Sequence, residues 1–519
     1  MSDMSIANVI RTAAERFASR VAVQDADGAV TFDELSARVH ELAAGLIDAG
    51  VAPGRPVLVL LPNSVAAIEI DLALAIGGHI RVALNPRVGE REWLRIAADC
   101  SPAALIVDPA VDGSTEFVRR LGLQLVFSTD HISAIAGRVE RARPRPDLPV
   151  PDPDSLCGLH YSSGTTGIPK GAQRSHANRL ASLRAMTEQV LEGTMEGGRQ
   201  PVFIHAGPVI HTSGLFVLPF LQAGGRQVLL EHARPPRIVE AIAEFGGTHT
   251  ALVPTVIARM LDLSDEQLKP MREMRMLAYA GAPMPVEHLR QAYQRITPNL
   301  VQYYGMVEAI PPLTVLTISD HHRGMAVDPD LLSSIGRPCP EVEIGFLLDG
   351  GAVQDGEVGE LSVRGPAVSP GYHNAATRTD LGKAHSDGVL RSGDLGFRSS
   401  NGYLHLTGRS RDMIITGGYN VYPREVEEEI SAIDGVGDVA VVGIPDPVWG
   451  QVIVAAFTRT EDAVLDEATV LAESRNRLPD YKRPKSVHLV DDLPLTPLGK
   501  VDRASVLRQI DGLRSAIPG

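Results

Sequence analysis

The sequence predicts an α/β fold with a large N-terminal domain of layered α/β subdomains, a small β subdomain and a C-terminal α+β domain. The chain has 519 residues, which is more than one ordinary hydrophobic core accommodates. Helical and strand patterns alternate along most of its length, which is typical of sheets buried between helices. From Arg409 onward the pattern changes to a compact stretch of about 110 residues, a normal size for a separate domain.

The first elements illustrate this alternation. Residues 31–49 predict a helix, because Thr31 and Glu34 have the spacing of a capping box and apolar residues follow at intervals of three and four. Gly50 ends that run. A strand is predicted at 57–61, and a further helix and strand within 65–84. These elements predict the start of a largely buried sheet.

The later elements divide the chain. Five prolines between residues 141 and 155 predict an extended connector. Glycines spaced through 351–371 predict short strands and turns, and so the small β subdomain. In the C-terminal stretch we expect helices at 423–433 and 468–478 and strands at 439–444, 452–458 and 486–490.

Composition excludes several classes of protein. A net charge of −14 argues against a nucleic-acid or anionic-membrane surface, since both need a basic patch. The apolar stretch 65–84 is interrupted by Glu69, Asp71, His79 and Arg81, so we expect no membrane span. The first residues lack the pattern of a signal peptide, and we therefore expect a cytoplasmic protein. The three scattered cysteines, Cys100, Cys157 and Cys339, are expected to be buried and reduced.

The loop from Tyr161 to Gly171 carries the strongest chemical signal. Its glycines let backbone N–H groups turn toward an anion, its serines and threonines add hydroxyl donors, and Lys170 adds a positive charge. These features predict a phosphate-binding loop. It is not a Walker A loop, because Gly171 stands where that pattern has Ser or Thr directly after the lysine.

This loop resembles the signature loop of the adenylate-forming superfamily, which includes acyl-CoA synthetases, peptide-synthetase adenylation domains and firefly-type luciferases. The resemblance extends from Thr31 to Lys500, with the motifs in the family's order. It implies that the loop holds the β- and γ-phosphates of ATP and makes Thr165 a candidate catalytic residue. It also implies phosphate-binding roles for Ser162, Ser163, Gly164, Thr166, Gly167 and Lys170.

Two further motifs resemble the nucleotide-binding segments of the family. Gly281, Ala282 and Pro283 resemble the adenine-binding turn. The run 302–308 resembles the Y-G-x-T-E motif, which implies that Tyr303, Tyr304 and Gly305 line the adenine and acyl sites and that Glu308 holds Mg²⁺. The chain departs from this motif at Val307, where the family usually has a hydroxyl that contacts the α-phosphate.

The C-terminal motifs imply the remaining roles in adenylation. By the resemblance, Asp394 and Arg409 bind the ribose, and Lys500 is the catalytic lysine that bridges the substrate carboxylate and the α-phosphate. Arg411 stands at the family's hinge position, usually Asp or Lys. The resemblance thus implies an AMP- and acyl-binding domain at 1–408, a hinge at 409–411 and a mobile domain at 412–519.

The resemblance also indicates where the thiol and the acid bind. Gly417, Gly418 and Tyr419 resemble the segment that lines the thiol tunnel, and Trp449 could cover the adenine of CoA or belong to the rim of the core. His211 occupies the entrance of the acyl pocket, and Tyr279 is expected inside it. The stretch 214–221 has no acidic residue to pair with a substrate amine, which disfavours an amino acid. Aromatic residues that could line an apolar pocket are Phe203, Phe216, Tyr279, Tyr303 and Tyr304.

Together these motifs predict an ATP- and Mg²⁺-dependent ligase that converts a carboxylic acid, fatty or aromatic, to an acyl-adenylate and transfers the acyl group to CoA. Two alternatives remain open at this point. One is an acyl-AMP ligase that feeds a carrier protein; the other is a nucleotide-binding homologue with impaired catalysis, suggested by Val307 and Arg411. A homodimer is expected only by analogy with the family.

Overall fold

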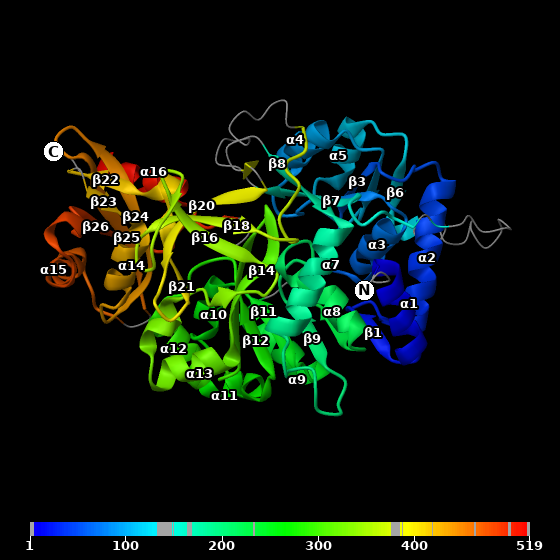
Figure 1. Ribbon diagram of the computed structural model, residues 1–519, viewed down its shortest axis with the longest axis horizontal. Helices are drawn as coiled ribbons and strands as arrows, with labels where there is room; N and C mark the ends of the chain where they lie inside the picture. The colour runs from blue at the N-terminus through cyan, green and yellow to red at the C-terminus, as the bar shows by residue number, and fades with distance from the viewer. Residues whose placement is uncertain are drawn as a thin grey trace.

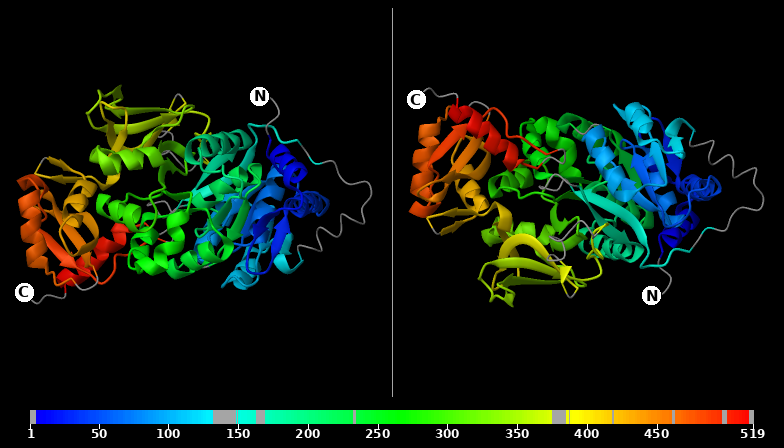
Figure 2. Two further views of the ribbon diagram at one scale, coloured as in Figure 1. Left: turned by 90° about the horizontal axis from the view of Figure 1, so that it is seen from below. Right: turned by 90° about the horizontal axis from the view of Figure 1, so that it is seen from above.

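The computed structural model describes residues 5–131, 148, 150–162, 169–231, 234–374, 385–386, 388–417, 419–460, 463–496 and 500–515. These residues form four sheets with helices packed against them (Figure 1). In both views of Figure 2 the N-terminal helices and the C-terminal residues lie at opposite ends of an elongated molecule. The architecture is the mixed α/β fold that the sequence predicts.

The first sheet begins the N-terminal half. Its strand order is β6 (Val126–Ser128), β5 (Ala104–Val107), β3 (Pro56–Leu60), β4 (Ile80–Ala83), β7 (Leu156–Ser162) and β8 (Lys170–Ser175). All neighbours are parallel except β7 and β8, which form an antiparallel pair. The connecting helices are α3 (Val65–Ile76), α4 (Glu90–Cys100) and α5 (Ser114–Leu121), and α7 (His176–Ala185) follows β8. Every residue of β3 is buried, as expected for a strand covered on both faces.

The second sheet has nine strands and forms the centre of the molecule. Their order is β15 (Arg337–Pro338), β14 (Ala309–Leu316), β13 (Leu300–Met306), β12 (Met276–Tyr279), β11 (His249–Leu252), β9 (Val202–His205), β10 (Arg226–Leu229), β1 (Val21–Gln24) and β2 (Ala29–Thr31). Its helices are α1 (Ile6–Phe17), α2 (Phe32–Asp48), α8 (Val217–Gln222), α9 (Pro235–Phe245), α10 (Pro254–Met260), α11 (Asp265–Leu268), α12 (Val286–Arg295) and α13 (Ile318–Ala326). Strands β9 to β13 run parallel, so the carboxyl ends of β12 and β13 meet at one edge.

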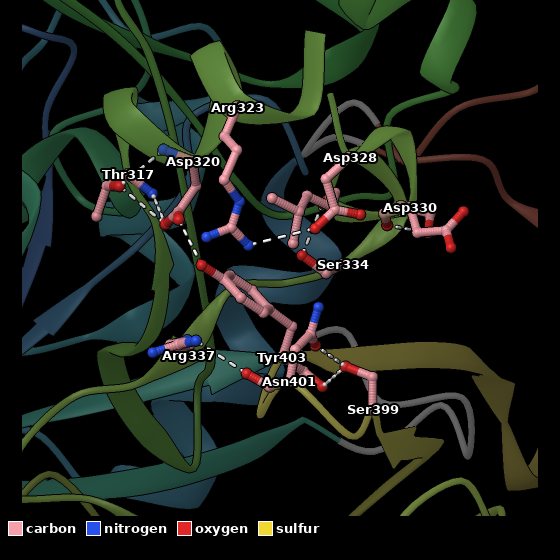
Figure 3. A network of polar contacts seen from close by, with 12 residues as sticks. Thr317, Asp320, Arg323, Asp328, Asp330, Ser334, Arg337, Ser399, Asn401 and Tyr403 are labelled. Atoms are coloured by element: carbon pink, nitrogen blue, oxygen red, sulfur yellow. Dashed lines mark hydrogen bonds and ion pairs between the residues drawn. The ribbon is translucent and has the colours of Figure 1, made fainter. Parts of the chain in front are cut away.

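The third sheet is the small β subdomain. It contains β17 (Gly351–Ala352), β16 (Glu343–Leu348), β18 (Gly359–Arg364), β20 (Val389–Arg398), β19 (His385–Ser386) and β21 (Leu404–Arg409). The turn between β20 and β21 is bound to the nine-stranded sheet by a polar network (Figure 3). Tyr403 donates its hydroxyl to Asp320 Oδ1 of α13 at 2.5 Å, and the Arg337 guanidinium donates to the Asn401 carbonyl at 2.8 Å. This network fixes the position of β20 and β21 relative to β13.

The fourth sheet lies in the C-terminal part. It consists of β23 (Tyr419–Val421), β22 (Ile414–Thr416), β25 (Gly450–Arg459), β24 (Val436–Asp446) and β26 (Ser486–Leu489). Helices α14 (Pro423–Ser431), α15 (Glu467–Arg477) and α16 (Arg503–Ser515) accompany it. The chain passes from the third sheet to the fourth between Arg409 and Ile414.

Several local predictions are confirmed. The helix expected at 31–49 is α2, and its capping box between Thr31 and Glu34 is present. The helices and strands expected after residue 423 match α14, α15, β24, β25 and β26 within a few residues at their ends. The three cysteines are buried and free. A search of the described residues finds no helix that combines the length and apolar character needed to cross a membrane. Most of the proline-rich connector lies outside the described residues.

Candidate active site

A carboxylate, a guanidinium and a phenol meet where the second and third sheets join. The register of β20 and β21 places Asp394 opposite Arg409, and the Arg409 Nε atom lies 2.9 Å from Asp394 Oδ1. Tyr304 reaches the same carboxylate from β13, and its hydroxyl donates to Asp394 Oδ2 at 2.5 Å. Burial and the neighbouring Asp394 carboxylate hold the pKa of Tyr304 well above its ordinary value. The three residues therefore form a preorganised group in which each oxygen of the Asp394 carboxylate has one partner and can still accept a further hydrogen bond.

Tyr303 does not belong to this group. Because side chains alternate along a strand, Tyr303 points to the opposite face of β13 from Tyr304. It is 1% exposed and packs against Phe216, with ring centroids 6.0 Å apart. Phe216 in turn stacks on Phe203. The structure thus places these three rings in the core, although the sequence analysis expected them around the ligands.

Glu308 lies in the turn between β13 and β14, and the Tyr372 hydroxyl donates to its carboxylate. It borders a cavity of about 420 Å³ that is also lined by Met306, Glu360, Tyr372, Leu390, Arg391, Ser392 and Gly393. The described residues contain no cluster of three metal-ligating side chains. Mg²⁺ is commonly held by one or two carboxylates together with substrate phosphates, so a single glutamate at this place fits that ion.

Lys500 brings the C-terminal part of the chain to the end of β12. Its Cε atom lies 3.9 Å from the position that a Cβ atom on Gly281 would occupy. Gly281 has a φ of +89°, a conformation that favours glycine, so the turn that includes Ala282 and Pro283 approaches the lysine closely. Lys500 is exposed at the surface, but desolvation by the protein around it lowers its pKa, and the positive charge of Arg409 lowers it further, whereas Asp394 and Glu308 oppose the shift. Lys500 is therefore close to both acids.

The two ends of the phosphate loop are adjacent in the structure. Ser162 pairs with Lys170 and Tyr161 pairs with Gly171 across β7 and β8. The Tyr161 hydroxyl donates to Asp99 Oδ2 at 2.6 Å, and its ring occupies the space beside Gly171. The predicted ligands Ser163, Gly164, Thr165, Thr166 and Gly167 lie outside the described residues, as does the side chain of Ser162.

The segment expected to receive the thiol lies on the fourth sheet. Gly417 donates its backbone N–H to the Trp449 carbonyl at 2.9 Å, and the indole ring leaves no room for a side chain at Gly417. The Lys485 ammonium lies 4.8 Å from the centre of the Trp449 ring, which is half exposed. Tyr419 stacks on Tyr481 at 4.8 Å. Gly418 lies outside the described residues, and Arg411 occupies a short 3₁₀ turn, Ser410–Asp412.

A buried cavity lies behind His211. Its lining combines apolar residues of α3, α7 and α8 with a polar, basic group that includes Asp71, Arg81, His160, Arg174 and Arg179. Tyr279, also expected in the acyl pocket, does not line this cavity. Tyr279 is 1% exposed in the core, and its hydroxyl is 2.9 Å from His321 Nε2.

The sequence analysis missed the arginines of this cavity. It treated Asp71 and Arg81 only as interruptions of an apolar stretch, and it did not single out Arg174 or Arg179. Charged residues at buried positions of a predicted strand, as at Arg81, are the one signal that could have revealed them.

Comparison with known proteins gives the relationship of the chain. The family description "AMP-binding enzyme" matches residues 10–373, and "AMP-binding enzyme C-terminal domain" matches residues 425–500. The chain is 35% identical to a feruloyl-CoA synthase of Amycolatopsis sp, over 94% of this chain and 95% of that protein. It is 31% identical to a medium/long-chain-fatty-acid–CoA ligase of Mycobacterium tuberculosis, over 92% of this chain and 86% of that protein.

A solved structure agrees with these relatives. The amide bond synthetase McbA of Marinactinospora thermotolerans superposes with a TM-score of 0.87 at 31% identity, covering 97% of this chain and 99% of that one. Two family descriptions, two curated relatives and one solved structure thus agree over nearly the full length. The chain belongs to the AMP-binding enzymes, the adenylate-forming superfamily, in its acyl-CoA ligase branch.

Proposed function

We propose that this protein is an AMP-forming acid–thiol ligase, which activates a carboxylic acid with ATP and transfers the acyl group to CoA. The observation that carries the proposal is the position of Lys500, which lies beside Gly281 and within the electrostatic reach of Asp394 and Glu308. Curated relatives over more than nine-tenths of the chain are CoA ligases, one for fatty acids and one that makes feruloyl-CoA, which supports a fatty or aromatic acid.

Adenylation joins anionic groups, so the protein must neutralise charge and align the reacting atoms. A carboxylate oxygen of the acid attacks the α-phosphorus of ATP, and pyrophosphate leaves. In this proposal Lys500 holds the attacking carboxylate against the α-phosphate, and Lys170 with Thr165 and the rest of the loop holds the leaving phosphates. Asp394 and Arg409 bind the ribose, and Gly281, Ala282, Pro283, Tyr304 and Gly305 border the adenine. Mg²⁺ bound at Glu308 supplies additional positive charge to the phosphates.

The second half-reaction requires the thiol to approach from the side that Lys500 occupies. We propose that residues 412–519 rotate about a hinge at 409–411 relative to residues 1–408, with Arg411 absorbing the change. The change of sheet between Arg409 and Ile414 supports a boundary there. After rotation, Gly417, Gly418, Tyr419 and Trp449 would line the path of the CoA thiol; the close approach of Gly417 to Trp449 is compatible with a narrow passage.

Measurement of both half-reactions tests this function. Pyrophosphate exchange into ATP, run with a panel of carboxylic acids, reports adenylation, and AMP release with and without CoA reports thiol transfer. We expect exchange with at least one acid and AMP release that accelerates strongly with CoA. The absence of exchange with every acid would contradict the proposal and favour an impaired nucleotide-binding protein, whereas exchange without any acceleration of AMP release by CoA would favour an acceptor other than CoA, such as a carrier protein.

An amine acceptor is a second candidate. The similarity to the amide bond synthetase, 31% identity over almost the whole of both chains, favours this possibility. An assay that supplies CoA or a primary amine to the same acyl-adenylate distinguishes the two acceptors. Faster consumption with CoA at equal concentration is the expected result.

We further propose that the enzyme works in the cytoplasm, because its three cysteines are buried and free, as suits a reducing compartment. A homodimer is proposed by analogy alone. Light scattering of the purified chain tests this oligomeric state.

A further inference from the structure

The basic cavity behind His211 is built on three adjacent strands. Arg81 of β4 is in register with Gly158 of β7, and Gly158 is in register with Arg174 of β8. Residues in one row across a sheet share a face, so the two arginines flank the glycine on the same side. Gly158 has no side chain to fill the space between them, and a Cβ atom there would lie 3.4 Å from His160 Nε2. The His160 ring, two residues further along the same strand, packs over Gly158 instead, so this imidazole and the two guanidinium groups lie together on one face of the sheet and line the cavity.

The charges in this cavity do not balance. Asp71 of α3 is paired twice: its Oδ1 atom lies 3.1 Å from Arg81 Nε, and its carboxylate also accepts hydrogen bonds from Arg179 of α7. The same carboxylate thus serves two arginines. Arg174 has no ion pair among the described residues, and its Nε atom is buried without a hydrogen-bond partner there. Two guanidinium groups consequently share one carboxylate, and the third, that of Arg174, lies outside this pairing.

The other titratable groups that line the cavity do not supply negative charge, and the Glu308 carboxylate, which borders a different cavity, acts on Arg174 only from outside this one. Burial, and then the charge of Arg174, holds the pKa of His160 well below its ordinary value. Burial also lowers the pKa of His211 to about 4, with further contributions from Arg81, Arg174 and Lys500. Both imidazoles are therefore neutral near pH 7. Burial raises the pKa of the Cys157 thiol, which keeps it protonated.

An unpaired guanidinium in such a place is costly, because desolvation of a charge is not repaid without a partner. Burial and the neighbouring Arg81 lower the pKa of Arg174 to about 9, which reflects that cost. The residues that line the cavity thus carry three guanidinium charges against one carboxylate, that of Asp71. A ligand that brings negative charge would relieve this excess.

The cavity is adjacent to the reacting end of the acid site. His211 lines it, and the charge of Lys500 lowers the pKa of His211 together with the charges of the arginines. Arg174 stands four residues beyond Lys170 on β8, a separation of about 13 Å along the strand. The cavity therefore adds a cationic group that is distinct in position from the lysine of the phosphate loop.

We propose that this cavity receives a second anionic group, a carboxylate or a sulfonate, at the far end of the acid substrate. This inference rests on the proposed ligase function but replaces the fatty or aromatic acid with a short dianionic one: one acidic group is adenylated at Lys500, and the other is held between Arg174 and Arg81. Carboxylates and sulfonates accept the paired N–H donors of a guanidinium. The cavity has a volume of about 70 Å³, which accommodates about five water molecules. Because so little space is available, the acid that reaches into it must be short.

Matched acids test the inference with the full-length protein. Pyrophosphate exchange is measured with succinate against butanoate, adipate against hexanoate and sulfoacetate against acetate. Each pair differs mainly by the distal anion. We expect kcat/KM to favour the dianion by ~10²-fold in at least one pair, the value of a charge-assisted hydrogen bond lost on substitution.

Three variants assign that preference to the cavity. Arg174→Met should lower kcat/KM for the preferred dianion by ~10²-fold while leaving the KM for ATP and the rate with the matched monoacid unchanged. Arg174→Lys, which keeps the positive charge, should restore part of the loss. Arg119→Met removes an arginine whose side chain is 71% exposed on α5, and it should leave kcat/KM for both acids unchanged. Thermal unfolding of Arg174→Met should show no loss of stability, because the variant removes an unpaired charge.

The outcomes separate this inference from the function on which it rests. Equal or greater activity with the monoacids in every pair would overturn the inference and leave the ligase function intact. A raised KM for ATP in Arg174→Met, with the acid preference unchanged, would also overturn it and assign the arginine to phosphate. No exchange with any acid would overturn the ligase function itself. An Arg174→Met protein that binds succinate or sulfoacetate as tightly as the native chain, by calorimetry, would likewise overturn the inference.

Discussion

Two groups of polar and charged side chains lie in the N-terminal 409 residues, and they are organised differently. The junction cluster, Tyr304, Asp394 and Arg409, contacts its carboxylate from two sides with one phenol and one guanidinium. The arginine cluster, Asp71, Arg81, Arg174 and Arg179, has one carboxylate that pairs with Arg81 and Arg179, and a third guanidinium, that of Arg174, outside this pairing. The charges of the junction cluster balance among its own residues, whereas the charges of the arginine cluster do not.

The difference shows how a protein can prepare two kinds of binding site. In the junction cluster, the internal bonds orient Asp394 before a ribose arrives, so little reorganisation accompanies binding. In the arginine cluster, Asp71 orients Arg81 and Arg179 and the remaining charge is left for the ligand. The first arrangement favours geometric recognition of a neutral group, and the second favours selection by charge.

The largest effect is expected from the removal of Asp71. Asp71→Asn leaves three buried guanidinium groups without a carboxylate, and we expect the free energy of unfolding to fall by about 3–5 kcal/mol. Denaturant unfolding measures this loss. As a control, Asp265→Asn breaks an ion pair with Arg295 in which the Asp265 side chain is 64% exposed, and it should cost less than about 1 kcal/mol.

The same variant has a defined pH dependence. Burial alone would raise the pKa of Asp71, but Arg179 and Arg81 outweigh burial and hold it below its ordinary value. A carboxylate with a lowered folded-state pKa contributes its stability above the pKa of the unfolded state and loses it as the pH falls through the folded value. The difference between native chain and variant should therefore narrow in acid. A difference that stays constant into strong acid would contradict the ion-pair explanation.

The next effect concerns Lys500, which joins the junction cluster from the C-terminal side. Lys500→Ala should reduce adenylation by ~10² to 10³-fold, because it removes a charged donor at the α-phosphate. Thiolysis of a preformed acyl-adenylate should be retained. Equal loss of both half-reactions would contradict the assignment, and Lys269→Ala, at an exposed lysine, serves as the control. Because the pKa of Lys500 is lowered, native adenylation should decline at a lower alkaline pH than an ordinary lysine would give.

A smaller effect tests the orientation of Asp394. Tyr304→Phe removes the hydroxyl that donates to this carboxylate at 2.5 Å. A hydrogen bond to a charged group contributes about 1.5–3 kcal/mol, so we expect the KM for ATP in pyrophosphate exchange to rise by about tenfold or more. Tyr303→Phe alters the neighbouring ring on the opposite face of β13 and should leave that KM unchanged. A change of similar size in both variants would indicate a general loss of packing.

The smallest effect is expected at Val307, between Met306 and Glu308. Val307→Thr adds a hydroxyl of nearly the same shape, and one additional hydrogen bond to the α-phosphate is worth about 1 kcal/mol, or about fivefold in the adenylation rate. Val307→Ala, which adds no donor, provides the matched control. A rate unchanged by the threonine would show that the hydroxyl does not reach phosphate here.

The sequence predicted the junction cluster better than the arginine cluster, for a physical reason. Tyr304, Asp394, Arg409 and Lys500 stand in contiguous motifs whose order resembles a known family. The arginine cluster comes from α3, β4, β8 and α7, and its members become neighbours only through the register of β4, β7 and β8. Each of its charges, taken alone, looks like an ordinary surface residue.

Predictions from short sequence patterns also differed in how well they held. The capping box at Thr31 follows from four consecutive residues and is confirmed. Phe203, Phe216 and Tyr303, which the sequence offered as lining for an apolar pocket, pack against one another in the core beside the second sheet. Composition shows that aromatic residues exist, but only the strand register determines which face each one occupies.

The bonds of Tyr403 and Arg337 in Figure 3 have a mechanical consequence. They join the third sheet rigidly to the nine-stranded sheet, so both belong to the part of the enzyme that stays fixed. If residues 412–519 rotate relative to this part, Asp394 and Tyr304 remain in contact with the nucleotide while Lys500 moves away from it. The reactive acyl-adenylate would then remain bound through its ribose during the whole rotation. It would not be free to dissociate when Lys500 releases its acyl-phosphate group.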